Sequence, residues 1–236
     1  MERFGPQTAR LAAVSRGGAA VVQILDIITE PQLAFRRIQA GRLNPWILGA
    51  CILALTMTVQ YYEAHRVFDA ISASAAASGP KMFAAVARAQ MIYLLAQPVV
   101  LVAKWLLIAF LLWTGLLLAT REARFVDLMV LTLSAQAIQV LHQSCVLIIA
   151  LVRGDDARRG LTDVGVNLLI DSGSRVLHDV AALCNPFSVW YLALLLYGVA
   201  HLSSTSPRRS IPALAPYGVL TLLVVVGAAV IRPAAA

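Results

Sequence analysis

One apolar stretch of the chain carries a row of polar side chains that could form hydrogen bonds inside a membrane. Within the stretch from Phe125 to Val152 these are Thr132, Gln136, Gln139 and Gln143, at offsets of 0, 4, 7 and 11. At about 100° per residue of an α-helix, the four side chains fall on one narrow face. A polar face turned towards lipid would lose several kcal/mol of hydrogen bonding. We therefore expect this face to contact other helices in a polar bundle core.

Lys104 is the second side chain that could have a functional role, because it is charged and lies in an apolar stretch. Charges inside a bilayer are rare, and they are usually paired or functional. Counting residues along the neighbouring spans places Lys104 level with Gln139, close to Gln143 and about one turn below Glu63. We predict that the ammonium contacts Glu63 or these two amides, and not Asp127. The sequence leaves open a lysine that extends to the outer headgroups instead.

No motif in the sequence indicates catalysis or metal binding. The patterns GxSxG, HExxH, GxGxxG and the phosphate loop are all absent. The three cysteines (Cys51, Cys145 and Cys184) form no CxxC pair, and the four histidines have no mutual spacing typical of metal ligands. We expect no catalytic residue, no metal and no cofactor.

Composition identifies the class of protein. The chain has 236 residues, of which 60% are hydrophobic and 13% charged, with a mean hydropathy of +0.78. Soluble domains carry roughly 25% charged residues, so an integral membrane protein is the class that fits. The net charge of +7 is typical of flanks that face an anionic membrane surface, and nucleic acid is not an expected partner. The abundance of arginine and alanine suggests a bacterial source, and hence the inner membrane.

The hydropathy pattern predicts an all-α, polytopic membrane protein. Residues 1–20 are expected to form a mobile basic tail, and residues 21–236 a membrane domain with a cytoplasmic N-terminus. Interfacial amphipathic helices accompany five predicted transmembrane helices, at about 44–62, 91–119, 125–152, 186–203 and 212–231. The small-residue segment 64–90 is predicted to be a loop that breaks at Gly79-Pro80.

Two amphipathic helices are predicted outside the spans. Residues 21–42 should lie in the membrane interface, with Arg36, Arg37 and Arg42 at the headgroups, or alternatively pack on a partner. Residues 161–183 should lie on the outer face. The polar face of this second helix is a possible partner surface, formed by Asp163, Asn167, Asp171, Ser174 and His178.

Two sequence stretches are similar to the Yip (Ypt-interacting protein) domain family of five-span membrane proteins. The first is 26–31 (DIITEP) followed by 35–38 (FRRI) and by Pro45-Trp46, and the second is 186–191 (PFSVWY) through Gly198. The resemblance covers about residues 24–231, and it implies a non-enzymatic protein. Eukaryotic relatives are associated with Rab-type small GTPases and vesicle traffic, and some bacterial relatives are thought to accompany membrane transport systems.

The sequence therefore supports two hypotheses about function. In the first, the protein is an adaptor or accessory subunit of a membrane transport or trafficking system, with the lipid bilayer and an ABC-type exporter or other membrane protein as partners. In the second, it is a transporter or lipid-translocating module that uses the polar core containing Lys104, Gln136, Gln139 and Gln143.

Overall fold

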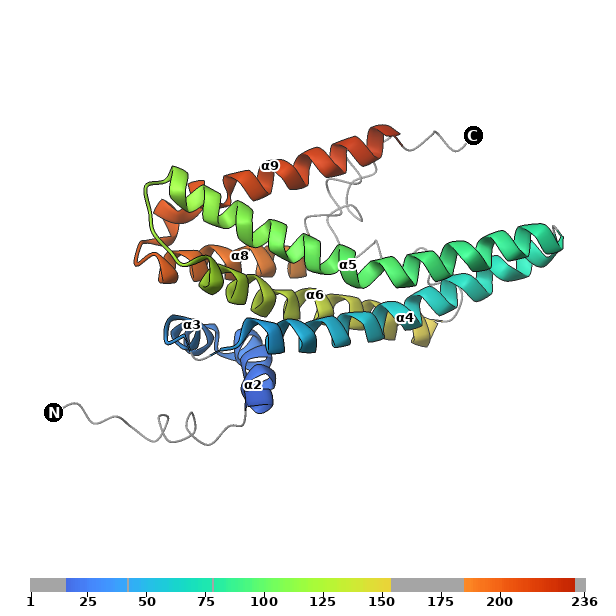
Figure 1. Ribbon diagram of the computed structural model, residues 1–236, viewed down its shortest axis with the longest axis horizontal. Helices are drawn as coiled ribbons and strands as arrows, with labels where there is room; N and C mark the ends of the chain where they lie inside the picture. The colour runs from blue at the N-terminus through green and yellow to red at the C-terminus, as the bar shows by residue number, and fades with distance from the viewer. Residues whose placement is uncertain (1–15, 42, 78, 154–184, 232–236) are drawn as a thin grey trace.

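The computed structural model describes residues 16–41, 43–77, 79–153 and 185–231, and this part of the chain is all-α (Figure 1). Five helices begin at a proline, whose fixed φ and missing N–H suit the first helical position. The helices are α2 (Arg16–Thr29), α3 (Pro31–Gln39), α4 (Pro45–Ala77), α5 (Pro80–Leu118), α6 (Phe125–Arg153), α8 (Pro186–Leu202) and α9 (Pro207–Ile231).

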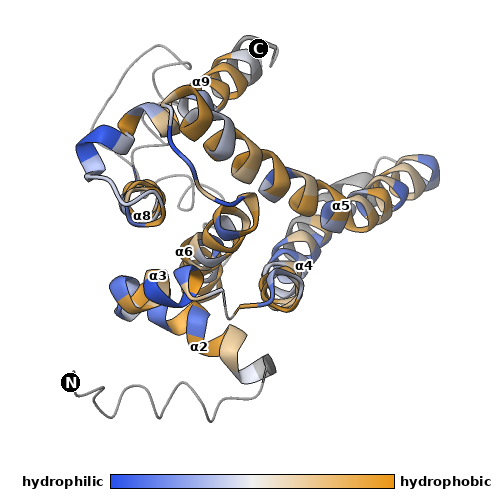
Figure 2. Ribbon diagram, turned by 60° about the vertical axis from the view of Figure 1, so that its left-hand side comes forward, coloured by the Kyte–Doolittle hydropathy of each residue, from blue (hydrophilic) through white to orange (hydrophobic). Residues whose placement is uncertain are grey.

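Several of these helices are long and apolar enough to cross a membrane. They are Pro45–His65 within α4, the whole of α5, and Phe125–Ile149 within α6. Helices α8 and α9 pass the same test together, as a pair bent by 119°, so the described part has three or four candidate spans. Hydrophobic residues dominate α5, α8 and α9, whereas the connections α5–α6 and α8–α9 are hydrophilic (Figure 2). This is an integral, polytopic membrane architecture.

Helix α6 lies at the centre of the bundle. It contacts α2, α3, α4, α5 and α8, and Figure 2 shows it surrounded by these elements. Every side chain from Val130 to Ile138 is buried, on all sides of the helix. Polar side chains of this segment can therefore form hydrogen bonds only within the protein.

The N-terminal segment forms two short helices that cross the bundle, and this corrects the prediction of a single helix over 21–42. Helix α2 ends at Thr29 because Pro31 has no N–H, and α3 begins there with the Leu33 amide donating to the Glu30 carbonyl oxygen (2.9 Å). Residues 16–20 belong to α2, so the predicted tail is wrong for these five. Arg42 and residues 1–15 lie outside the described residues.

Helices α4 and α5 form a long hairpin, so the predicted loop over 64–90 is wrong. Their 33 and 39 residues correspond to about 50 and 58 Å, well beyond the ~30 Å of a bilayer core. The hairpin extends past the other helices (Figure 1). Alanine, which makes the segment resemble a loop of small residues, is the strongest helix former. The break does fall at Gly79-Pro80, where Gly79 has a φ of +113°.

Two glycines allow close approach between helices. A Cβ at Gly115 of α5 would lie 2.1 Å from the backbone oxygen of Ala213 in α9, and one at Gly198 of α8 would lie 2.3 Å from Leu131 Cδ1 in α6. The first contact is with backbone, which cannot move aside as a side chain can.

Gly115→Ala should therefore separate α5 from α9 and destabilise the protein. Overpacking of this kind costs about 1–3 kcal/mol, and a lowered melting temperature in detergent would measure it. Gly218→Ala is the matched control, because a Cβ there meets nothing within 4 Å. Equal melting temperatures for the two variants would contradict the close approach of α5 and α9.

Candidate functional site

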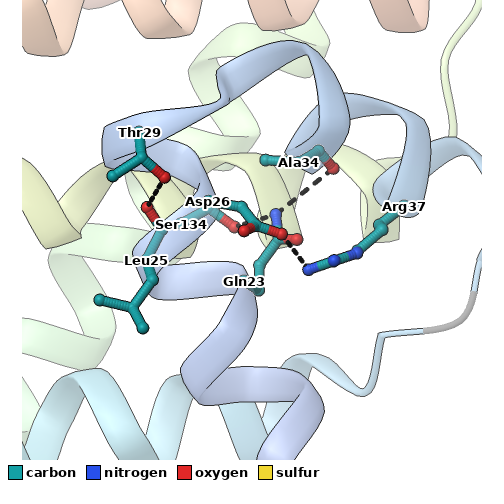
Figure 3. Close-up of polar contacts among 7 residues, drawn as sticks. All are labelled: Gln23, Leu25, Asp26, Thr29, Ala34, Arg37 and Ser134. Atoms are coloured by element: carbon teal, nitrogen blue, oxygen red, sulfur yellow. Dashed lines mark hydrogen bonds and ion pairs between the residues drawn. The ribbon is translucent and has the colours of Figure 1, made fainter. Parts of the chain in front are cut away.

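A buried glutamine joins three helices at one end of the bundle. The side chain of Gln23 in α2 is completely buried, and its Nε2 donates to Ser134 Oγ in α6 (3.2 Å) and to the Ala34 carbonyl oxygen in α3 (3.4 Å) (Figure 3). Both acceptors lie on elements that Gln23 reaches only in the folded state. The bond to Ser134 thus fixes the position of the α2–α3 pair on the central helix.

An ion pair between Asp26 and Arg37 fixes α2 against α3 (Figure 3). Both side chains are largely buried, with exposed fractions of 15% and 14% respectively. Burial raises the pKa of Asp26 above its ordinary value of 3.8, the charge of Arg37 opposes this, and the charge of Glu30 adds to it. The sequence predicts Arg37 at the headgroups, but in the structure its side chain forms a largely buried ion pair with Asp26.

The predicted polar face of α6 divides into a buried and a half-buried part. Thr132 and Gln136 are buried, and Gln136 Nε2 donates to the hydroxyl oxygen of Tyr191 in α8 (3.0 Å). Gln139 and Gln143 are half-buried. Sequence analysis does not identify Ser134, because it lies on the opposite face of α6 from the predicted polar face and its partner Gln23 is itself in an apolar helix.

Lys104 does not form the predicted contacts within the described part of the chain. No ion pair or hydrogen bond joins it to Glu63, Gln139 or Gln143, and both Lys104 and Glu63 are exposed. Next to Lys104, the buried face of α5 is formed by Leu101, Trp105 and Ile108, and Lys104 lies outside it. This favours the alternative of a lysine that extends along the surface of the bundle towards the headgroups.

A groove lies between α3 and α8, with a volume of about 480 Å³. The rings of Phe35 and His201 lie 5.9 Å apart at its wall, and Gln39 Nε2 donates to the His201 carbonyl oxygen (2.9 Å), which ties α3 to α8. The residues that line the groove are Pro31, Gln32, Phe35, Arg36, Trp190, Ala193, Leu194, Tyr197 and His201.

The groove brings together the two sequence stretches that resemble the Yip family. Pro31 and Phe35 come from the first stretch, and Trp190 comes from the second. Their meeting could not be inferred from the sequence, because it depends on how α3 crosses α8. The possible partner surface formed by Asp163, Asn167, Asp171, Ser174 and His178 lies outside the described residues.

The described residues contain no group of three or more His, Cys, Asp or Glu side chains placed to hold a metal ion. The arrangement is suited to binding a ligand. The Gln23–Ser134 hydrogen bond and the Asp26–Arg37 ion pair form a buried clamp that holds α2 and α3 in place. Beside this clamp lies the groove, with Arg36 at its edge.

A protein-family model described as the Yip1 domain matches residues 25–229. No curated protein and no solved structure matches the chain.

Removing the Tyr191 hydroxyl or the Gln136 amide should weaken the contact between α6 and α8. Interhelical hydrogen bonds in membranes are worth roughly 0.6 kcal/mol on average and up to about 2. In a double-mutant cycle with Gln136→Leu and Tyr191→Phe, unfolding free energies should show coupling of this size. Strictly additive effects would contradict a direct bond.

Arg37→Met should destabilise the protein by about 1–3 kcal/mol, because it leaves a buried carboxylate without its partner. With Arg37 absent, the pKa of Asp26 in the folded state rises further above 3.8. Below pH 3.8 the loss of stability should therefore be small, because Asp26 is protonated in both proteins. The loss should grow as the pH rises from the folded-state pKa of Asp26 in the unmodified protein to its higher folded-state pKa in Arg37→Met.

Two variants control this experiment. Arg36→Met changes the exposed neighbour and should leave the melting temperature near that of the unmodified protein. Adding Asp26→Asn to Arg37→Met should remove the pH-dependent part of the loss. A loss that is independent of pH between 3 and 8, or one not relieved by Asp26→Asn, would argue against the ion pair.

Proposed function

Because the chain belongs to the Yip1 domain family, we propose that it is a non-enzymatic adaptor or accessory subunit of a membrane transport or trafficking system. The Yip1 family is not known for enzymes. We place the protein in a bacterial inner membrane as a five-span bundle, with α8 and α9 crossing separately and the N-terminus in the cytoplasm.

The observation that carries this proposal is how the buried polar side chains are used. Gln23 bonds to Ser134, and Gln136 bonds to Tyr191. Each of these contacts joins two helices. Polar groups that bond to neighbouring helices, as Gln23 Nε2 and Gln136 Nε2 do, stabilise a bundle, whereas a transport pathway requires polar groups that are free to contact a substrate.

An arginine-rich end of the molecule supports a partner on the cytoplasmic side. Helix α3, the α5–α6 connection and the α8–α9 turn lie at the same end (Figure 1). Exposed arginines at this end are Arg36 in α3, Arg124 in the α5–α6 connection, and Arg208 and Arg209 in the first turn of α9. A transport complex such as an ABC-type exporter, or another membrane protein, is the partner we propose. The segment 161–183 remains a second proposed contact surface.

One observation favours the alternative, a transporter or lipid-translocating module. Thr132 Oγ1, Gln60 Oε1 and Gln143 Oε1 are buried and have no hydrogen-bond partner in the described part of the chain. Buried oxygens of this kind could bind a polar group that passes between the helices.

Reconstitution separates the two functions. We expect that purified protein in liposomes moves neither fluorescent lipid between leaflets nor encapsulated solute, at any protein density. In native membranes, a photo-crosslinking residue at Arg208 should then capture an integral membrane partner. The same residue at Val219, on the exposed apolar side of α9, should not. Flux by the protein alone that is lost in Gln143→Leu would overturn the adaptor proposal and establish the alternative.

A further inference from the structure

Arg36 lies at the junction of two depressions in the surface. One is the α3–α8 groove described above. The other is an adjoining hollow of about 340 Å³, lined by Glu30, Pro31, Gln32, Leu33 and Arg36. Pro31, Gln32 and Arg36 line both, so the two depressions adjoin at the start of α3.

Two opposite charges at this junction have no ion-pair partner. Asp26 is paired with Arg37, but neither Glu30 nor Arg36 forms an ion pair in the described ranges. Both side chains are exposed, and both line the hollow. A ligand that pairs with both charges would present a negative group to Arg36 and a positive group to Glu30.

The groove offers an apolar surface beside this charged hollow. Trp190, Ala193, Leu194 and Tyr197 line it along α8. It opens onto the exposed apolar face of that helix, where Val189 and Tyr197 are 60% and 57% exposed. In a membrane this face contacts acyl chains. The wall also contains His201, whose Nε2 is buried and has no hydrogen-bond partner among the described residues.

We propose that the α3–α8 groove binds one aminophospholipid from the surrounding leaflet. Its phosphate contacts the Arg36 guanidinium, its primary ammonium contacts the Glu30 carboxylate, and one acyl chain lies along α8 beside Trp190. An anionic headgroup without an amine would leave Glu30 without a positive partner, and a quaternary ammonium could not donate a hydrogen bond to it. This inference does not depend on the adaptor role.

Native mass spectrometry of the full-length protein tests the proposal. The protein is delipidated in detergent and titrated with phosphatidylethanolamine, phosphatidylglycerol or phosphatidylcholine of identical chains. We expect one phosphatidylethanolamine to be retained roughly tenfold more tightly than either of the others, because all three lipids share the phosphate and the single charge-assisted contact of the primary ammonium with Glu30 can provide a difference of this size. Equal retention of the three lipids by the unmodified protein would overturn the proposal without any variant.

Substitutions assign the two charges. Arg36→Gln should lower retention of phosphatidylethanolamine and phosphatidylglycerol alike, whereas Glu30→Gln should abolish the preference between them. Arg209→Gln is the matched control, since it removes an exposed arginine outside the groove and should change neither. If Arg36→Gln binds like Arg209→Gln, with unchanged melting temperatures for both, the phosphate does not contact Arg36.

Two further ligands test the head and the tail separately on the unmodified protein. N-acetylated phosphatidylethanolamine lacks the charged amine and should lose the preference. Glycerophosphoethanolamine has the headgroup without acyl chains, and it should not displace the lipid even at a hundredfold excess. Displacement by this soluble compound would show that the site takes a free phosphoester, and would overturn the lipid assignment.

Discussion

Two hydrogen bonds from polar side chains buried in the central helix to other helices position the elements of the bundle. Water is absent from a bilayer core, so an unpaired amide or hydroxyl there is costly. In α6, Ser134 accepts from Gln23 of α2, while Gln136 donates to Tyr191 of α8. These two bonds connect elements from opposite ends of the chain to one helix. The N-terminal pair and the C-terminal hairpin are thereby positioned relative to each other through α6.

This arrangement explains why the two motif stretches of the family occur together. Pro31 ends α2 and lets α3 turn across the bundle, and Phe35 then packs beside His201. Gly198 in the second stretch brings α8 against Leu131 of α6. The motif residues are thus packing residues that bring α3 onto α8, and the groove between these helices follows from that packing. Any ligand of the groove would contact parts of the protein that are fixed by the core.

The sequence predicts the all-α membrane class, the start of α6 at Phe125, the break at Gly79-Pro80 and the family. The prediction of a loop over 64–90 fails because an alanine-rich helix and a loop of small residues have similar hydropathy. The extension of α4 and α5 into a long hairpin is therefore missed. The sequence-based prediction also fails for Lys104, because a prediction of depth leaves the rotation of α5 undetermined. Ser134 and Gln23 are each unremarkable in sequence, and only tertiary contact gives them a role.

Two neighbouring arginines in α3 have different roles because their side chains point in different directions around the helix. Arg36 and Arg37 are adjacent, so their side chains point about 100° apart. Arg37 faces α2 and pairs with Asp26, which makes it part of the clamp. Arg36 faces outward and lines both surface depressions. The ion pair neutralises Asp26 and Arg37. Glu30 and Arg36 form no ion pair among the described residues, and both line the hollow at the start of α3. The clamp therefore determines which charges remain available to a ligand, as well as holding α3 in place.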